Sequence, residues 1–192
     1  MCPRGGESLV RVISGRWGGR ILPARIPSET RPTLDAVREA LFNMLACRMS
    51  FDGQSVLDLY AGSGALGIEA LSRGAAHATF VDRSKRAARA IDENCRALAI
   101  PPSLYTIVCE DAKRFLEQCD ERFTLMFADP PYQGVAEWKR LIPALLHAAC
   151  IVSGAVCVFE YSAALKLELP QPFQTIAERQ WGDTTCLIAC RQ

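Results

Sequence analysis

The sequence of 192 residues lacks the features that would place it in a membrane or outside the cell. No apolar run approaches the roughly 20 residues that a membrane-spanning helix needs. The first ten residues, MCPRGGESLV, contain no apolar stretch that could act as a secretion signal. We therefore expect a cytoplasmic protein without membrane association. Because 49% of the residues are hydrophobic, the chain can bury a substantial core.

Histidine is scarce, and the nine cysteines lack the spacing of a metal site. Only His77 and His147 are present, and no pair of cysteines is separated by two residues, whereas zinc sites need closely spaced ligands. We therefore expect no metal cofactor. Most cysteines lie in apolar segments and are expected to be buried, reduced thiols that act as small hydrophobic side chains: Cys95, Cys109, Cys150, Cys157, Cys186 and Cys190.

Lysine is absent from the first 38 residues, although this segment is basic. Seven arginines against three acidic residues give it a net charge of +4, and the remainder of the chain carries −3. Arginine suits two-point contact with phosphate. We therefore favour an arm that binds a polyanion over a solvated surface strand. The candidate phosphate contacts are Arg16, Arg20, Arg31 and Arg38.

From residue 55 onward, short apolar runs alternate with helical patterns. This order predicts an α/β fold with a mostly parallel, Rossmann-like sheet and helices on both faces. Two final runs around Trp181-Gly182-Asp183 predict an antiparallel edge. The expected strands are 56–60, 78–81, 105–109, 123–128, 155–161, 175–179 and 184–189, and the expected helices are 64–72, 84–98, 112–119 and 137–149.

The leading segment has a different pattern. Two β-prone runs, Leu9–Ser14 and Arg20–Leu22, flank Trp17-Gly18-Gly19, and glycines at a turn permit a hairpin. A helix is expected from about Thr33 to Ala46. We therefore expect one domain over 1–192, with a basic hairpin and loop at 1–32 and a catalytic body at 33–192.

A glycine turn, Ala61-Gly62-Ser63-Gly64, joins the strand VLDLY to the next helix. Glycines allow the backbone to approach a ligand closely, and helix-start amides face it. The letters also match the dinucleotide fingerprint, which alone is a weak signal. Asp58, just before the turn, can hold an ammonium group and would repel a pyrophosphate.

Two further aspartates end the following strands. Asp82 can accept hydrogen bonds from both ribose hydroxyls of an adenosine, and Asp111 can meet the adenine amine. Each alone could equally be a strand-end cap, but with Asp58 they favour S-adenosylmethionine as the cofactor. The expected cofactor residues are Asp58, Tyr60, Gly62, Ser63, Gly64, Asp82 and Asp111.

The fourth predicted strand runs into Asp129-Pro130-Pro131-Tyr132. Ligands bind at the carboxyl ends of strands in an open α/β sheet, so Asp129 is expected to face the same crevice as Gly62. The exocyclic amine of a base is a poor nucleophile, because its lone pair is delocalised into the ring. The Asp129 carboxylate and Pro130 carbonyl can accept its N–H groups and offset the charge that grows on nitrogen. Tyr132 offers a face for stacking on a flipped base; a purely structural Pro-Pro turn is the simpler alternative.

Together, the glycine turn, Asp82, Asp111 and the DPPY motif resemble amino-methyltransferases of nucleic acids. The leading segment is similar to one family among them, the bacterial guanine-N2 methyltransferases that modify 16S ribosomal RNA of the small subunit (the RsmD type). The likeness covers about residues 11–132 and weakens beyond them. The matching pieces are Gly15, Gly19-Arg20, Leu22-Pro23, Arg31-Pro32-Thr33, Val37-Arg38-Glu39, Leu41-Phe42-Asn43, LDLYAGSGALGIEALSRGA and Asn94.

The resemblance implies a single-domain class I methyltransferase whose hairpin meets RNA of an assembled or assembling small subunit; we expect a monomer. Asp82 stands where many members carry glutamate, and Arg83-Ser84 where an acidic residue is common. Three alternatives remain open: a DNA adenine-N6 or cytosine-N4 methyltransferase, which shares DPPY, a non-catalytic ribosome-binding assembly factor, and a dehydrogenase.

Overall fold

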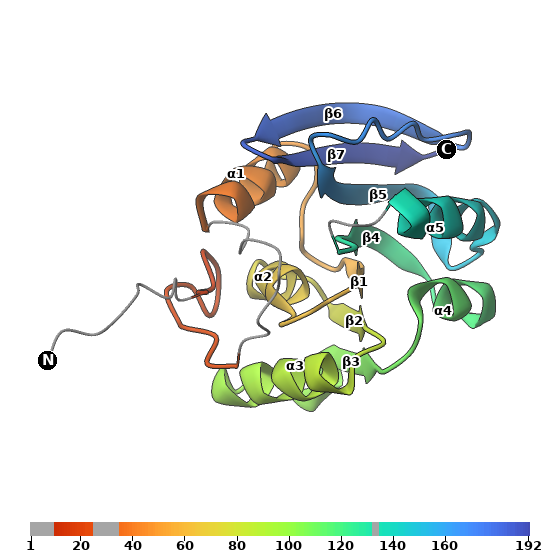
Figure 1. Ribbon diagram of the computed structural model, residues 1–192. Coiled ribbons are helices and arrows are strands. Elements are labelled where there is room, and N and C mark those ends of the chain that lie inside the picture. The colour runs from red at the N-terminus through yellow and green to blue at the C-terminus, as the bar shows by residue number, and fades with distance from the viewer. Residues whose placement is uncertain (1–9, 25–34, 132–134) are drawn as a thin grey trace, which may run out of the picture.

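Seven strands form one central sheet in the computed structural model, which describes residues 10–24, 35–131 and 135–192 (Figure 1). The strand order is β3-β2-β1-β4-β5-β7-β6. Strands β1 to β5 pair in parallel, and β7 runs antiparallel between β5 and β6. The predicted parallel sheet with an antiparallel edge is confirmed. The strands are β1 (Ser55–Leu59), β2 (His77–Val81), β3 (Tyr105–Val108), β4 (Phe123–Ala128), β5 (Ile151–Ser162), β6 (Phe173–Trp181) and β7 (Thr184–Arg191).

The order in which strands are added to the sheet reverses at β1. Strands β2 and β3 lie on one side of β1, and β4 and β5 lie on the other. Helices that follow neighbouring strands on the two sides of such a point pack on opposite faces, and the crevice between them opens at the carboxyl edge. The glycine turn leaves β1 at this edge, and Asp129 leaves β4 there. The topology alone therefore brings the two motifs together.

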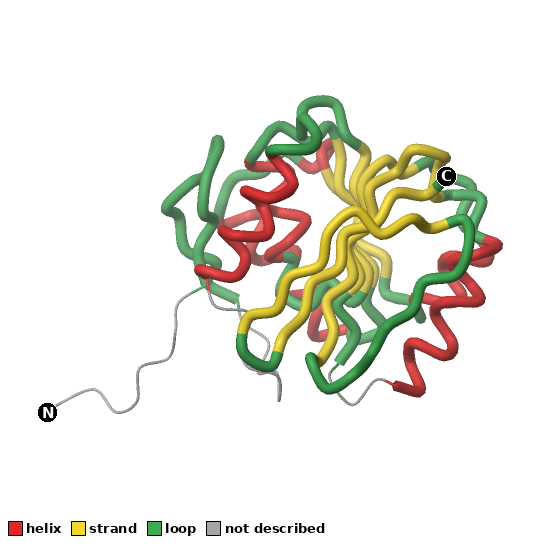
Figure 2. Tube along the Cα trace, turned by 90° about the horizontal axis from the view of Figure 1, so that it is seen from above, coloured by secondary structure: helices red, strands yellow, loops and turns green. Residues whose placement is uncertain are grey.

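The helices cover both faces of the sheet, as Figures 1 and 2 show. Helices α1, α2 and α3 share one apolar core with one face, which includes Phe42, Ile68 and Phe80. Helices α4 and α5 share a second core with the other face, which includes Trp138 and Phe159. Among the described residues, no helix is long and apolar enough to cross a membrane. The helices are α1 (Asp35–Ala46), α2 (Ala65–Ser72), α3 (Lys85–Ala97), α4 (Ala112–Gln118) and α5 (Val135–His147), with a 3-10 turn at Pro102–Leu104.

The leading segment folds back on itself as predicted, but with little strand pairing. The amide of Val12 donates to the carbonyl of Arg20 (2.9 Å), and the amide of Leu22 donates to that of Val10 (2.9 Å). A single antiparallel bridge, Arg11 with Ile21, is formed. The short ladder is stabilised by docking, because Trp17 in the turn is buried in the core that contains α2.

A buried carboxylate in α2 fixes this hairpin to the body. Glu69 is fully buried, and its two oxygens accept from the amides of Ile13 (2.6 Å) and Ser14 (3.1 Å). Arg73, one turn further along α2, pairs with Glu69 at 2.7 Å. The hairpin is therefore held by the helix that follows the glycine turn.

The cysteines fit the prediction in part. Cys95, Cys150, Cys157 and Cys186 are buried, and burial raises the pKa of the Cys157 thiol to about 12, which keeps it protonated. Cys109 is exposed and Cys190 half-buried, so burial was wrong for Cys109, which follows β3 at the open edge of the sheet. In the part of the chain that the structure describes, no three His, Cys, Asp or Glu side chains are grouped as ligands of a metal ion.

Two glycines of the hairpin provide a matched test of its docking. Gly15 and Gly19 have almost the same positive φ, 81° and 79°. A Cβ at Gly15 would lie 1.8 Å from the carbonyl oxygen of Ser72 in α2, whereas a Cβ at Gly19 would meet nothing within 4 Å. Gly19→Ala should therefore cost about 1 kcal/mol of backbone strain. Gly15→Ala should lower the free energy of unfolding by about 1–3 kcal/mol more, because the hairpin must shift away from α2. Denaturant unfolding of both variants measures the difference, and equal losses would show that the hairpin is not packed against α2.

Candidate active site

Asp82, which follows β2, is hydrogen-bonded to the glycine turn after β1. One carboxylate oxygen of Asp82 accepts from the amide of Gly62 (3.0 Å), and the other accepts from the amide of Ser84 (2.8 Å), the N-cap of α3. Gly62 and Gly64 both have positive φ, 56° and 79°, which favours glycine. Asp82 thus ties the turn to α3. Each of its oxygens retains a second lone-pair site, so the geometry leaves room for the predicted ribose contact, which stays a prediction.

The surroundings of the turn fit a ligand that lies close to the backbone. A Cβ at Gly62 would meet only one atom, the carbonyl oxygen of Tyr60, at 3.8 Å. A Cβ at Gly67 would lie 2.3 Å from the ring of Phe80. The turn is therefore open on the Gly62 side and closed on the Gly67 side, where α2 packs against the sheet.

Asp58 lies inside β1, beneath the turn, rather than at the open end of the strand. It is 1% exposed, and its carboxylate accepts from the amide of Gly67 at 2.9 Å. Burial, and to a smaller degree the nearby charge of Asp82, raise the pKa of Asp58 to about 8, against the opposing effect of the Gly67 hydrogen bond. The carboxyl group is thus mostly protonated at neutral pH in the free protein. A bound ammonium group would favour its ionised form.

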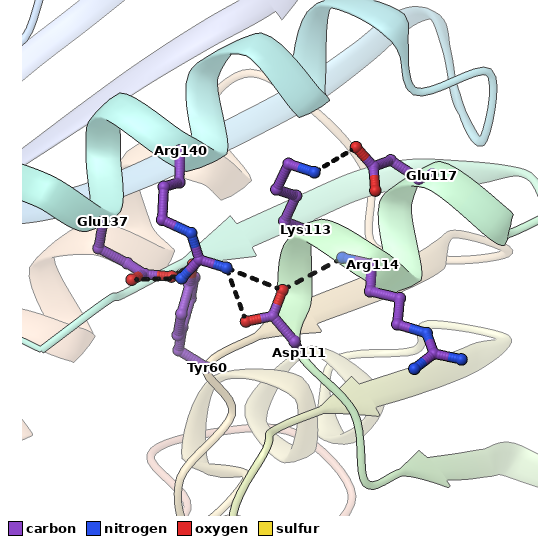
Figure 3. Close-up of polar contacts among 7 residues, drawn as sticks. All are labelled: Tyr60, Asp111, Lys113, Arg114, Glu117, Glu137 and Arg140. Atoms are coloured by element: carbon purple, nitrogen blue, oxygen red, sulfur yellow. Dashed lines mark hydrogen bonds and ion pairs between the residues drawn. The ribbon is translucent and has the colours of Figure 1, made fainter.

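Asp111, which follows β3, and Tyr60, which follows β1, belong to one polar network with residues of α5 (Figure 3). Asp111 caps α4 through the amide of Arg114 (3.2 Å) and forms an ion pair with Arg140 of α5 (3.3 Å). Arg140 also pairs with Glu137 at 3.2 Å, and the Tyr60 hydroxyl donates to Glu137 at 2.8 Å. Burial would raise the pKa of Asp111, but the Arg114 amide and Arg140 lower it overall, which keeps the carboxylate ionised.

Glu137 and Arg140 were not found from the sequence. They lie on α5 at a spacing of three residues, a common surface pattern that gives no hint of contact with strand ends. Tyr60 has φ of 58°, a conformation uncommon for a residue with a side chain. Its backbone turns into the glycine loop while its hydroxyl is held by Glu137.

Asp129 follows β4 directly and continues the ladder with β1, since its amide contacts the carbonyl of Leu59 at 3.5 Å. Pro130 is buried, and Pro131 is exposed. Burial, and then the charges of Glu160 and Asp58, raise the pKa of Asp129 well above its ordinary value. Tyr132 lies outside the described residues, so its predicted stacking role stays a prediction.

Glu160 of β5 is a third residue that the sequence did not single out. It is 3% exposed although it carries a carboxylate, and the buried thiol of Cys186 lies 3.9 Å from one of its oxygens. The available signal was a single acidic residue inside the otherwise apolar run AVCVFEYS. A charged residue is rarely buried without a specific partner or a functional role.

Asn94 of α3 joins the leading segment to the cofactor side. It is fully buried, and it both accepts from the amide of Ala24 (2.8 Å) and donates to the Ala24 carbonyl (3.0 Å). The same amide group donates to the carbonyl of Ser63 at 2.9 Å. The end of the described hairpin is thus hydrogen-bonded to the residue that shapes the glycine turn.

The structure gives the predicted phosphate-binding arginines different environments. Arg16 is exposed, with its guanidinium 5.3 Å from the centre of the Trp17 ring. Arg20 donates to the carbonyls of Ala97 (2.7 Å) and Leu98 (2.9 Å), the carboxyl end of α3. Arg20 therefore caps a helix, where a cation is favoured by the helix dipole.

Arg38 is only 3% exposed and lies inside the fold. It forms an ion pair with Asp35 (2.9 Å) and donates to the carbonyl of Arg11, which joins α1 to the hairpin. The structure therefore does not support Arg38 as a phosphate contact, because its guanidinium does not reach the surface. Arg31 lies outside the described residues.

A family model and a named relative both match this chain in sequence. The family model described as conserved hypothetical protein 95 matches residues 10–190. The Escherichia coli (strain K12) protein named ribosomal RNA small subunit methyltransferase D is 41% identical over 128 residues. That match covers 67% of this chain and 63% of the relative, so it spans less than two thirds of the relative's length.

Solved structures extend the likeness to almost the whole chain. A structure from Escherichia coli described as a candidate methyltransferase, yhhF, superposes with a TM-score of 0.82 at 32% identity and covers 96% of this chain and 99% of its own. A structure described as a candidate methyltransferase, SMU.776, complexed with S-adenosylhomocysteine superposes with a TM-score of 0.65 over 81% of this chain and 48% of its own. At 17% identity, that second likeness shows the fold alone.

The protonated state of Asp58 leads to a calorimetric prediction. Because the pKa of Asp58 is about 8, binding of the ammonium group of S-adenosylmethionine should lower that pKa and release close to one proton at pH 7. Affinity should accordingly rise between pH 6 and pH 8. Titration in phosphate and in Tris, which differ in ionisation enthalpy, measures the released proton. Asp58→Asn should abolish the release, and Asp52→Asn at an exposed site should keep it. Equal binding enthalpies in the two buffers for the unmodified chain would contradict the assigned contact.

Proposed function

The chain belongs to the family described as conserved hypothetical protein 95, and on that basis we propose that it transfers a methyl group from S-adenosylmethionine to the exocyclic N2 amine of a guanine in 16S ribosomal RNA. The motif resemblance to the small-subunit methyltransferases is thereby confirmed at the level of the family. One observation carries the proposal: Asp129 leaves β4 beside the glycine turn of β1, at the edge where both strands end.

The residues around the turn fit the proposed cofactor. The open side of Gly62 can admit a nucleoside, Asp82 can accept from its ribose, and the buried Asp58 can accept from its ammonium group. Asp111 is an ionised acceptor at the end of β3 for the adenine amine. When bound, the cofactor supplies an electrophilic methyl group on a positively charged sulfur.

The chain's own residues act on the amine. The Asp129 carboxylate and the Pro130 carbonyl accept its two N–H groups, which directs the nitrogen lone pair out of the plane of the base. When the methyl group is transferred, the positive charge that develops on nitrogen would favour the ionised form of Asp129 over the protonated form that burial favours, and that carboxylate would offset the charge. The methylated nitrogen is positively charged and therefore acidic, so it loses one proton to solvent and no strong base is required.

The leading hairpin is proposed to bind RNA of the small subunit. Arg16 is exposed in the hairpin, which Glu69 and Asn94 hold beside the glycine turn. Relatives named as ribosomal RNA methyltransferases support RNA over DNA as the substrate. We also propose that the protein is cytoplasmic, that it is a monomer and that it uses no metal cofactor.

Asp129→Asn tests the assigned chemistry. The substitution keeps the shape of the side chain but removes its charge and replaces one acceptor with a donor. Single-turnover methyl transfer to small subunits that lack the modification should slow by about 100- to 1,000-fold, while affinity for S-adenosylmethionine changes little. Asp120→Asn, at the exposed opposite end of β4, is the matched control and should keep the full rate. A near-normal rate for Asp129→Asn would refute the role.

Salt dependence tests the hairpin. Arg16→Ala should weaken binding to small subunits and reduce the slope of log affinity against log salt concentration by about 1, because one phosphate contact is lost. Arg122→Ala removes the same charge at an exposed site before β4 and should leave the slope unchanged. If the two variants have the same slope as the unmodified chain, Arg16 does not contact a phosphate.

A further inference from the structure

Glu160 lies beside Asp129 at the carboxyl edge of the sheet. In the parallel pairing of β4 with β5, Ala128 is opposite Phe159, so the next positions on the two strands are Asp129 and Glu160. Neighbouring strands are about 4.8 Å apart in the direction of their hydrogen bonds. The two acidic residues therefore leave adjacent strands at the same level.

Both side chains emerge on the same face of the sheet. Phe127 and Val158 are paired across β4 and β5, and both belong to the core that α1, α2 and α3 cover. Alternate residues of a strand point to one face, so Asp129 shares the face of Phe127, and Glu160 that of Val158. Cys186, opposite Glu160 on β7, lies in that core as well and contacts the Glu160 carboxylate.

The protein retains two carboxylates at this position, in spite of their cost. Glu160 is 3% exposed, and its charge is one of the causes that raise the pKa of Asp129. Two carboxyl groups at the same level of neighbouring strands can each accept a hydrogen bond from one of two neighbouring donors of a ligand. A substrate with two adjacent N–H groups matches this arrangement.

Guanine is the RNA base that presents such a pair. Its exocyclic N2 amine neighbours a ring nitrogen, N1, that carries a hydrogen, whereas the ring nitrogen beside the amine of adenine or cytosine is a bare acceptor. We propose that Glu160 is a specificity-determining residue that accepts the N1–H of the target guanine, while Asp129 accepts from the N2 amine. This inference rests on the proposed function and deepens it. A bare ring nitrogen at the same place would face the Glu160 carboxylate and be rejected.

The test replaces the target guanine by 2-aminopurine, which keeps the amine and the glycosidic bond but has a bare N1. Small subunits that lack the modification are first treated with the unmodified chain, and mass spectrometry locates the methylated guanosine. No methylated guanosine at this stage would refute the proposed function itself. Subunits are then reconstituted with ligated 16S RNA that carries guanine or 2-aminopurine at that site, and kcat/KM is measured for each.

The unmodified chain should prefer guanine by at least about 100-fold, as sites that hydrogen-bond a substrate N–H reject analogues without it. The side-chain amide of the Glu160→Gln variant can donate an N–H to the bare N1 of 2-aminopurine. The kcat/KM of this variant for guanine should therefore exceed that for 2-aminopurine by no more than about tenfold. Glu178→Gln, which removes a carboxylate that accepts from the Tyr161 hydroxyl, is the matched control and should keep the full preference. Similar kcat/KM values of the unmodified chain for both subunits, or full preference in Glu160→Gln, would overturn the inference.

If Glu160→Gln is inactive on both substrates, a more conservative variant, Glu160→Asp, still tests the inference. Affinity for S-adenosylmethionine reports whether the fold survives, because the cofactor residues lie on other strands. Glu160→Asp retains a carboxylate and should retain the preference for guanine at a reduced rate. If Glu160→Asp is active but accepts 2-aminopurine as well as guanine, Glu160 acts on the fold rather than on the base.

Discussion

The parallel strands of the sheet all end at one edge, and this constraint forces acidic side chains from neighbouring strands into a small volume. Asp82 and Asp129 follow β2 and β4 at this edge, and Asp58 and Glu160 lie close to it inside β1 and β5. The fold limits their repulsion with backbone amides, which donate to Asp58 and Asp82, and by burial, which raises the pKa values of Asp58 and Asp129. The remaining negative potential suits a cationic cofactor and a base that presents N–H groups.

Two buried polar side chains extend this arrangement to the leading hairpin. Glu69 of α2 holds two hairpin amides, and Asn94 of α3 bonds both to Ala24 and to the carbonyl of Ser63. Buried groups of this kind are costly to leave unsatisfied, so the hairpin and the glycine turn are positioned together. A substrate bound by the hairpin would thus be oriented relative to the cofactor without a separate recognition domain.

Most of the fold could be predicted because its signals are local. The alternation of apolar runs and helical patterns located the strands and helices of the body, and the glycine turn and DPPY motif located the edge where they meet. The tertiary partners could not be predicted in the same way. Arg20 and Arg38 were both predicted to contact phosphate; Arg20 is exposed but also caps α3, and Arg38 is buried against Asp35. The position of Glu160 beside Asp129 became visible only through the pairing of β5 with β4, since no local pattern sets one strand beside another.

The central claim is that this edge of the sheet methylates the N2 amine of a guanine in 16S ribosomal RNA. The most direct measurement is nucleoside mass spectrometry after the chain has reacted with isotopically labelled S-adenosylmethionine and small subunits that lack the modification, with DNA in a parallel reaction. The account predicts that the label appears as N2-methylguanosine in 16S RNA. Label in N6-methyladenine or N4-methylcytosine of the DNA, or no transfer to either nucleic acid, would contradict it.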